Sequence, residues 1–318
     1  MYLIEEALTS WLLNEYKNPV ITKEQLSLQI YMFYLKKEYK GEKIHQIRKE
    51  KAESNEFEKN IFKLLRSGVI SRVEDKAPYH MHPHLIGGFY EVFYIKGNAN
   101  VSENDIICST YPYGYLSYLS AMEWHNITDK IPKFIHFTTC PSNQWKGRFI
   151  SEFKESHPDI DDINKFIPRF PRNSTVNDID LIITQETHYV EPMKSRNSCV
   201  RVSSIGKTFM DMTRRPEYCG GEDHVIETFI EYGKKYSPSI IKDVDKFGRP
   251  IDKARIGFIL DKIIGVENKK VNEWKSESVK TRGSSKVLSP KSPFSPYFDE
   301  DWSISVNVDM VNNYGKRN

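Results

Sequence analysis

Apolar residues recur at every third or fourth position in three segments near the N-terminus, and this spacing predicts three amphipathic helices. The first helix covers residues 2–16. The second begins after Thr22, because Gln25 stands three residues later in the capping-box position. The third begins with Ser54 as its cap and stops at Gly68, which can adopt the left-handed conformation common after helix ends.

Two segments rich in β-forming residues follow the third helix, and each predicts a strand. They are VISRV, residues 69–73, and FYEVFYI, residues 89–95. Three helices followed by a two-stranded ribbon is the layout of a winged helix-turn-helix domain, in which the third helix enters the major groove of DNA. We therefore expect such a domain over residues 1–98, which ends where the polar, turn-rich stretch KGNANVSEND begins.

The remaining residues, 99–318, predict a larger domain of mixed α/β structure. Residues 111–139 predict a closely packed helix over 112–124, a turn, and a strand over 134–139, whereas 141–175 is interpreted as an insertion of mixed structure. Further strands are expected at 180–184, 199–203 and 302–308, and further helices from 208, at 222–232 and at 253–264. Strands and helices do not alternate regularly as in βαβ units, so the predicted fold class is α+β.

Composition and charge limit the class of protein. A chain of 318 residues favours two domains, and its 28% charged residues suit a soluble globular protein. A net charge of +3 does not by itself predict a polyanionic partner. No basic segment precedes the first apolar stretch, and no run approaches the roughly 18 apolar residues of a membrane span, so we expect a cytoplasmic protein without a membrane partner. The four cysteines lack zinc spacing, which favours buried free thiols and no cofactor.

Positive charge is concentrated next to the predicted third helix. The preceding segment, residues 36–51, holds seven Lys and Arg against three Glu, a local balance of +4. Positions that the apolar stripe leaves free on the helix carry side chains suited to base edges and phosphates. Glu56 and Glu58 on the same helix, and the long loop before it, fit the alternative of a merely solvated face. The predicted DNA-contacting set includes one arginine of the following strand and consists of Asn55, Lys59, Asn60, Lys63, Arg66 and Arg72.

Two motifs suggest metal or nucleotide binding, and neither is complete. The histidines of HMHPH, residues 80–84, alternate and could converge on a metal, but the intervening proline and the lack of a carboxylate or cysteine cluster nearby favour a wing loop. SSIGKT, residues 203–208, carries the end of a phosphate-binding loop, but Arg201 stands where that loop needs glycine. We therefore predict no metal site and no nucleotide loop.

An enzymatic alternative depends on Asp178 and Asp180. In nucleotidyltransferases two aspartates at alternate positions of a strand hold Mg²⁺, and alternate positions do face one side of a strand. Those enzymes also need a Gly-Ser helix start upstream, where this chain has Phe170, Pro171 and Arg172. We expect a protein that is not an enzyme, with Mg²⁺-dependent nucleotidyl transfer as the alternative.

Three blocks of the sequence, taken in order, resemble one known family. PYGYLSYLSAMEWHNITDKIPKFIHFTT is similar to the central motif of the AbiEi-type antitoxins of type IV toxin-antitoxin systems. VRVSSIGKTFMDMTRRPEYCGGEDHVIETF resembles the second block of that family, and RGSSKVLSPKSPFSPYFDEDWSISVNV resembles its C-terminal block. The resemblance covers most of the chain outside 141–175. The chain departs from the family at Lys207, where arginine is usual, and at Asn126, where glycine is usual.

The resemblance implies an antitoxin that is also the autoregulating transcriptional repressor of its operon, in a phage defence that acts by abortive infection. The N-terminal winged helix would bind double-stranded promoter DNA. The C-terminal domain would counteract a nucleotidyltransferase-like toxin without a stable complex. A DNA-binding regulator without antitoxin activity is the remaining alternative.

Overall fold

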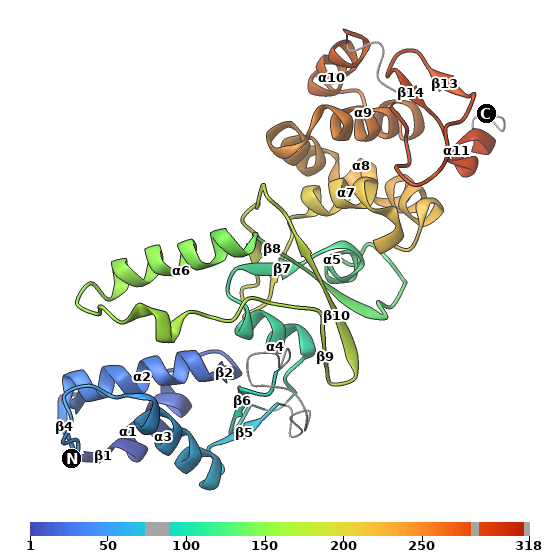
Figure 1. The fold of residues 1–318 in the computed structure, drawn as a ribbon. Helices are drawn as coiled ribbons and strands as arrows, with labels where there is room; N and C mark the ends of the chain where they lie inside the picture. Colours follow the sequence, from blue (N-terminus) through green and yellow to red (C-terminus); the bar gives the residue numbers. More distant parts are fainter. Residues whose placement is uncertain (74–88, 99, 281–285, 315–318) are drawn as a thin grey trace. The chain divides into compact units, whose positions relative to one another are not determined.

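The computed structural model describes residues 1–73, 89–98, 100–280 and 286–314 (Figure 1). Helices and strands are mixed along the chain, so the predicted α+β class is confirmed. The chain forms two compact units, and the expected domain boundary near Asn98 does not coincide with a boundary between them. Unit 1 comprises Met1–Tyr115, Phe137–Tyr189 and Lys194–Arg201, and unit 2 comprises Leu116–His136, Val190–Met193 and Val202–Asn318.

Unit 1 begins with the three helices that the apolar spacing predicts. They are α1 (Ile4–Asn14), α2 (Lys23–Lys36) and α3 (Ser54–Arg66). The predicted capping box of α2 is confirmed: Thr22 Oγ1 accepts a hydrogen bond from the Gln25 N–H at 3.2 Å, and Gln25 Oε1 accepts one from the Thr22 N–H at 2.9 Å. Helix α1 is shorter than predicted, because its first residues form a strand, β1 (Tyr2–Leu3).

A three-stranded antiparallel sheet shares the core of unit 1 with these helices. Its strands are β2 (Val20–Thr22), β5 (Ile70–Arg72) and β6 (Val92–Ile95), in the order β2-β6-β5. Strands β5 and β6 lie within the predicted segments VISRV and FYEVFYI, which confirms both. Strand β2 was not predicted, because three residues are too few for an alternating pattern to stand out.

A hairpin lies within the basic segment before α3. Strands β3 (Glu38–Tyr39) and β4 (Glu42–His45) pair antiparallel, and β1 pairs parallel with β4. The two residues of the turn, Lys40 and Gly41, both have positive φ, at 51° and 77°. Two such residues between paired strands form the tight turn that matches strand twist, and glycine adopts it without strain. The expected long loop is therefore partly a β-hairpin.

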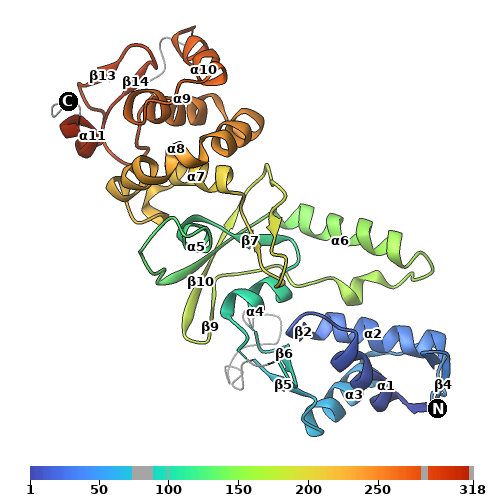
Figure 2. The same ribbon diagram turned by 180° about the vertical axis from the view of Figure 1, so that it is seen from behind.

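The core of unit 1 includes residues from the segment 141–175. This segment forms α6 (Ser142–Ser156) and a 3-10 turn, η1 (Ile163–Phe166), and the chain after α6 lies beside α2 in both views (Figures 1 and 2). The Phe166 ring centroid is 5.4 Å from that of Tyr31 in α2 and 6.3 Å from that of Phe57 in α3. Instead of being a separate insertion, the segment packs on the helices of unit 1.

Residues 112–124 do not form the single helix that their apolar spacing predicts. A helix α4 (Glu103–Thr110) precedes them, and they divide into a strand β7 (Gly114–Leu116) and a short helix α5 (Tyr118–Trp124). Strand pairing explains the difference. Strand β7 is hydrogen-bonded beside β8 (Phe134–Thr139), and a Cβ on Gly114 would lie 2.1 Å from the Phe137 ring. The predicted strand over 134–139 is confirmed as β8.

The largest sheet in the described part of the chain has six strands. Their order is β11-β12-β7-β8-β10-β9. The four not yet introduced are β9 (Ser174–Val176), β10 (Ile179–Gln185), β11 (Met193–Lys194) and β12 (Arg201–Val202). The strands predicted at 180–184 and 199–203 are thus confirmed, and the second is shorter than expected.

Unit 2 is mainly helical. The apolar stripes predicted from 222 and from 253 are confirmed, since Val225 and Phe229 of the first and Ile256 and Leu260 of the second are buried in the core of this unit. The strand predicted over 302–308 is present only as β14 (Ile304–Ser305). In the described part of the chain no helix has both the length and the apolar character to cross a membrane. The elements are α7 (Ile205–Arg214), η2 (Pro216–Tyr218), α8 (Glu222–Phe247), α9 (Pro250–Phe258), the π-helical turn η3 (Ile259–Ile263), α10 (Lys269–Lys280), β13 (Phe298–Asp299), β14 (Ile304–Ser305) and α11 (Asp309–Tyr314).

Candidate nucleic-acid interface

Helix α3 presents a stripe of exposed side chains opposite its buried side. Its buried residues include Phe57, Ile61 and Leu64, which pack in the core of unit 1. On the other side, residues spaced i, i+4, i+7 and i+11 form what we call the exposed stripe of α3. At about 1.5 Å per residue it extends roughly 16 Å, which is long enough to pass several base pairs. The stripe consists of Asn55, Lys59, Phe62 and Arg66.

The two acidic residues of α3 are engaged in ion pairs with neighbouring lysines. Glu56 lies 2.7 Å from Lys49 Nζ, and its carboxylate also accepts a hydrogen bond from the Glu53 N–H at 3.1 Å. The hydrogen bond from Lys49 is the main cause that lowers the pKa of Glu56. Glu58 lies 2.5 Å from Lys23 Nζ. Both carboxylates therefore face cations of the protein, which reduces the repulsion that they would exert on a phosphate backbone.

Three of the six side chains that were predicted to contact DNA interact instead with other residues of the protein. Asn60 is only 3% exposed, and its Nδ2 donates to the Glu56 carbonyl at 2.8 Å, so it cannot reach a base. Its predicted role is wrong, because it lies on the side of α3 that packs against the core. Lys63 is partly exposed and lies 3.8 Å from Glu5. Arg72 donates to the Tyr90 carbonyl at 3.0 Å, and its guanidinium stacks over the Tyr90 ring.

The exposed stripe also contains Phe62, which the sequence-based prediction missed. That prediction counted only the polar side chains outside the apolar stripe as DNA contacts. The helical spacing could have identified the exception, since Phe62 follows Lys59 by three residues and precedes Arg66 by four. Its side chain is 65% exposed, so it belongs to the outer face.

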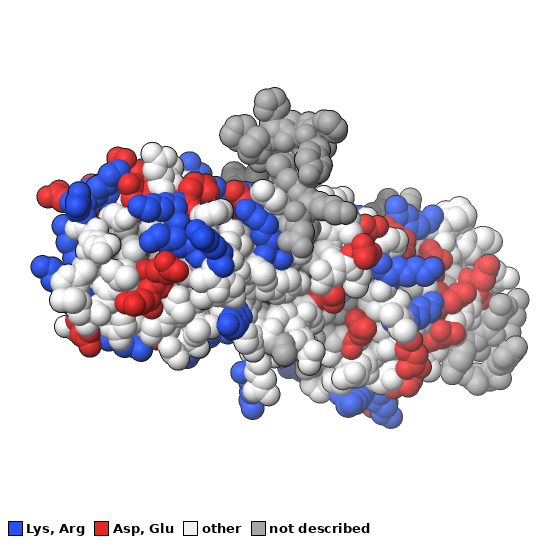
Figure 3. Space-filling model, turned by 90° about the horizontal axis from the view of Figure 1, so that it is seen from below, with Lys and Arg blue, Asp and Glu red and all other residues white. Residues whose placement is uncertain are grey.

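The basic segment 36–51 adds further cations to the same unit. Lys40 lies 3.4 Å from Glu15 and Lys49 pairs with Glu56, so two of its seven basic residues are neutralised. The other five form no ion pair with residues that the structure describes. Figure 3 shows Lys and Arg side chains gathered on the surface of unit 1 with a few Asp and Glu between them. The five are Lys36, Lys37, Lys43, Arg48 and Lys51.

The geometry that the enzymatic alternative requires is not found at Asp178 and Asp180. Strands β9 and β10 form a hairpin in which Val176 pairs with Ile179. The two residues between them, Asn177 and Asp178, both have positive φ, so Asp178 lies in the turn and not on the strand. Asp180 lies on β10 and accepts a hydrogen bond from Thr175 Oγ1 at 3.0 Å. The two carboxylates therefore do not occupy alternate positions of one strand.

The segment SSIGKT begins α7, and its lysine is buried. Ser204 caps the helix, since its Oγ accepts a hydrogen bond from the Lys207 N–H at 3.3 Å. Lys207 Nζ pairs with Asp211 one turn later, and both side chains are almost inaccessible to solvent. The lysine therefore serves the interior of unit 2, because its charge is compensated there and is not presented at the surface.

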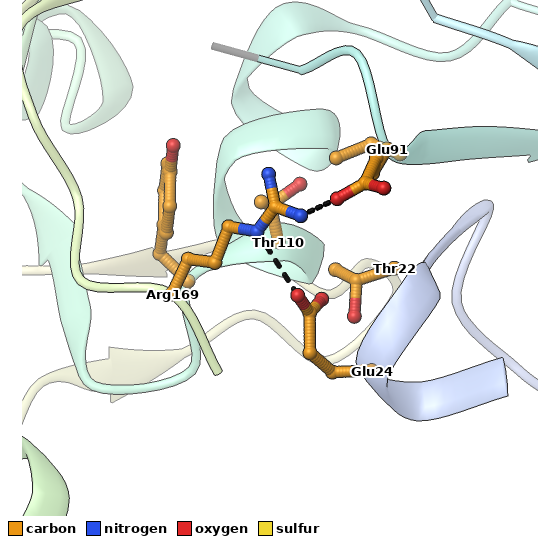
Figure 4. A pocket seen from close by; sticks show the side chains of 7 residues that line it. Thr22, Glu24, Glu91, Thr110 and Arg169 are labelled. Carbon is orange, nitrogen blue, oxygen red and sulfur yellow. Dashed lines mark hydrogen bonds and ion pairs between the residues drawn. The ribbon is translucent and has the colours of Figure 1, made fainter. Parts of the chain in front are cut away.

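A small hollow in unit 1 is closed by ion pairs (Figure 4). Arg169 Nε donates to Glu24 at 3.0 Å, and Arg169 Nη2 pairs with Glu91. Lys23 approaches the same Glu91 at 2.8 Å. The cavity volume of about 20 Å³ is room for about one water molecule, which is too little for a nucleotide. The arginine joins the segment 141–175 to α2.

The described residues show no arrangement typical of a metal site, and most of their cysteines are buried. These residues contain no group of three or more His, Cys, Asp or Glu arranged to hold a metal ion, and the histidines of HMHPH lie outside them. The cysteines are free, and Cys108, Cys140 and Cys219 are buried as expected, whereas Cys199 is partly exposed. Burial raises the pKa of Cys199 to about 11, so its thiol is protonated at neutral pH.

Comparison of the sequence with protein-family models and with curated proteins finds no match. The likeness to AbiEi-type antitoxins therefore rests on the three sequence blocks described above.

Proposed function

We propose that this protein is a sequence-specific DNA-binding regulator, in which α3 enters the major groove of the target. The elements α1, β2, α2, α3, β5 and β6 follow one another in this order, with the hairpin β3–β4 inserted between α2 and α3. This succession and the sheet order β2-β6-β5 support a winged helix-turn-helix interpretation of residues 1–98. The observation that carries the proposal is the exposed stripe of α3. It offers an amide and two cations to solvent, while both glutamates of the helix are occupied by lysines.

The stripe has the chemistry of major-groove recognition. An Asn side chain can form two hydrogen bonds to an adenine edge, and an Arg side chain can form two to guanine. Asn55 lies in the first turn of α3, where recognition helices make many of their base contacts. Lys59 and Arg66 form no ion pair with other described residues, so they can displace counterions from phosphates without breaking a bond within the protein.

The resemblance to AbiEi-type antitoxins supplies the proposed setting. The protein would be an antitoxin and an autoregulating repressor of a type IV toxin-antitoxin operon, with promoter DNA as its direct partner. The part of the chain that forms unit 2 would counteract a nucleotidyltransferase-like toxin without a stable complex. No catalytic step is proposed, since Asp178 lies in a hairpin turn.

The DNA proposal is tested by a mobility-shift titration with the full chain and the region upstream of its own reading frame. Replacing Lys59 and Arg66 together by Ala should weaken binding by about 1–3 kcal/mol and should make the affinity less dependent on salt, by roughly one in slope for each lost phosphate contact. The matched control is Lys234→Ala with Lys242→Ala, an equal charge change on exposed positions of α8 in unit 2. Equal affinities of both double variants and the unaltered chain would exclude this helix from the interface.

The antitoxin proposal is tested in cells that express a nucleotidyltransferase-like reading frame adjacent to this one. The full chain should restore growth and repress a reporter placed behind the upstream region. The variant Lys59→Ala with Arg66→Ala should lose repression and keep growth rescue, because the antitoxic function is assigned to other residues. Absence of rescue by the unaltered chain, at a protein level that represses the reporter, would leave a regulator without antitoxin activity.

A further inference from the structure

Phe62 occupies an unusual position for a phenylalanine. Its side chain is 65% exposed, more than that of any other phenylalanine in the described part of the chain. The neighbouring Phe57 of the same helix is 5% exposed and packs in the core. A phenyl ring in water contributes none of the stabilisation that burial would provide, so it does little for the fold of unit 1 where it stands. Single exposed apolar residues are common, and the neighbours of Phe62 are what distinguish it.

Those neighbours are the polar residues of the exposed stripe. Lys59 lies one turn before Phe62 and Arg66 one turn after it, so any surface that receives the ring also receives two positive charges. Glu58, also one turn before the ring, is paired with Lys23 at 2.5 Å. A second copy of the chain, docked by the same face, would bring these cations against their own counterparts. A duplex meets both requirements, because its phosphates attract the cations and its major groove carries one apolar group, the C5-methyl of thymine.

We infer that Phe62 is a specificity-determining residue that contacts a thymine methyl group in the major groove. The inference rests on the proposed DNA binding and makes it more specific. The preferred target contains an A·T pair at the position that faces the middle of α3. The contact is apolar and does not depend on salt, whereas the contribution of Lys59 and Arg66 does.

The experiment removes the methyl group and the ring separately. Duplexes tiled across the region upstream of the reading frame are titrated with the full chain. The tightest duplex is then remade with deoxyuridine in place of thymine at one position at a time, which deletes a methyl group and leaves base pairing unchanged. The unaltered protein should lose affinity about fourfold at one or two positions, the effect expected for one buried carbon group.

The variant Phe62→Ala should bind the thymine and deoxyuridine duplexes equally at those positions, and Phe62→Leu should keep part of the preference. The matched control is Ile131→Ala, which removes an apolar side chain that is 84% exposed in unit 2 and should keep the whole preference. Far-ultraviolet circular dichroism checks that each variant is folded.

The possible outcomes separate this inference from the proposed function. If the unaltered chain binds no duplex, the DNA proposal fails. If it binds but no deoxyuridine position weakens it, or if Phe62→Ala keeps the full thymine preference, DNA binding stands and the thymine contact is wrong. A loss of self-association in Phe62→Ala, with the thymine preference retained, would assign the ring to a protein interface and would overturn the inference.

Discussion

Replacing Asp252 by Asn should destabilise unit 2 strongly. Asp252 is inaccessible to solvent and lies near the start of α9. Arg214 donates to its carboxylate from Nε and Nη2 at 3.1 and 2.8 Å, and Arg249 donates from its backbone N–H at 2.9 Å and from Nε at 3.0 Å. Burial alone would raise the pKa of this carboxyl. The hydrogen bonds from the two arginines outweigh it and lower the pKa to about 2.

The size of the effect follows from that shift. A carboxyl whose pKa falls from 3.8 to about 2 contributes roughly 2 kcal/mol to the free energy of unfolding at neutral pH. Asn also removes the charged acceptor of two Arg214 hydrogen bonds, and the remaining ion pair of this partly buried arginine with Asp211 is longer, at 4.0 Å. We therefore expect a loss of about 2–4 kcal/mol. The contribution of the carboxylate is complete above the unfolded pKa of 3.8 and is lost as the pH falls through the folded value near 2. The two proteins should therefore become more similar in stability as the pH is lowered from 5 towards 2.

Asp301→Asn provides the matched control. The pKa of Asp301 is also lowered to about 2, first by the hydrogen bond from Lys262 and then by that from Lys275, but its side chain is 50% exposed. Solvent screens such a pair, so the loss should stay below about 1 kcal/mol. Urea unfolding at several pH values, followed by tryptophan fluorescence, measures both variants. Equal losses from the two variants at pH 7, or a loss from Asp252→Asn that does not shrink in acid, would refute this reasoning.

Three further predictions follow from the geometry of single residues. Asn60→Ala should cost about 1–2 kcal/mol in urea unfolding, because it removes a buried hydrogen bond, and should leave the bases contacted in a footprint unchanged. Gly257→Ala should lower the thermal unfolding temperature despite its better helix propensity, because the new Cβ would lie 2.2 Å from the Trp302 ring; an unchanged temperature would mean that the ring can move away. Asp178→Asn with Asp180→Asn should leave repression of the reporter intact, and its loss in a folded protein would revive the enzymatic alternative.

Local interactions account for what the sequence by itself determined. The α+β class, the start of α2 at the Thr22 capping box and the strand over 134–139 all follow from patterns of residues that are close in sequence. The same patterns predicted α3 as the candidate interface, with Asn55, Lys59 and Arg66 on its outer face. Contacts within one helical turn involve residues three or four apart, and alternate residues of a strand face the same side. Neither relation depends on the rest of the chain, so both can be inferred from spacing.

Only the tertiary structure decided which residues of these elements are available for function. Asn60 is polar and was expected to contact DNA, yet the core closes over it, whereas the apolar Phe62 is left in solvent. Strand β7 forms where a helix was expected because β8 pairs with it, and Phe166 of a supposed insertion packs against the first helices. Burial and strand pairing depend on partners that are distant in sequence, and residue spacing within one segment carries no information about those partners.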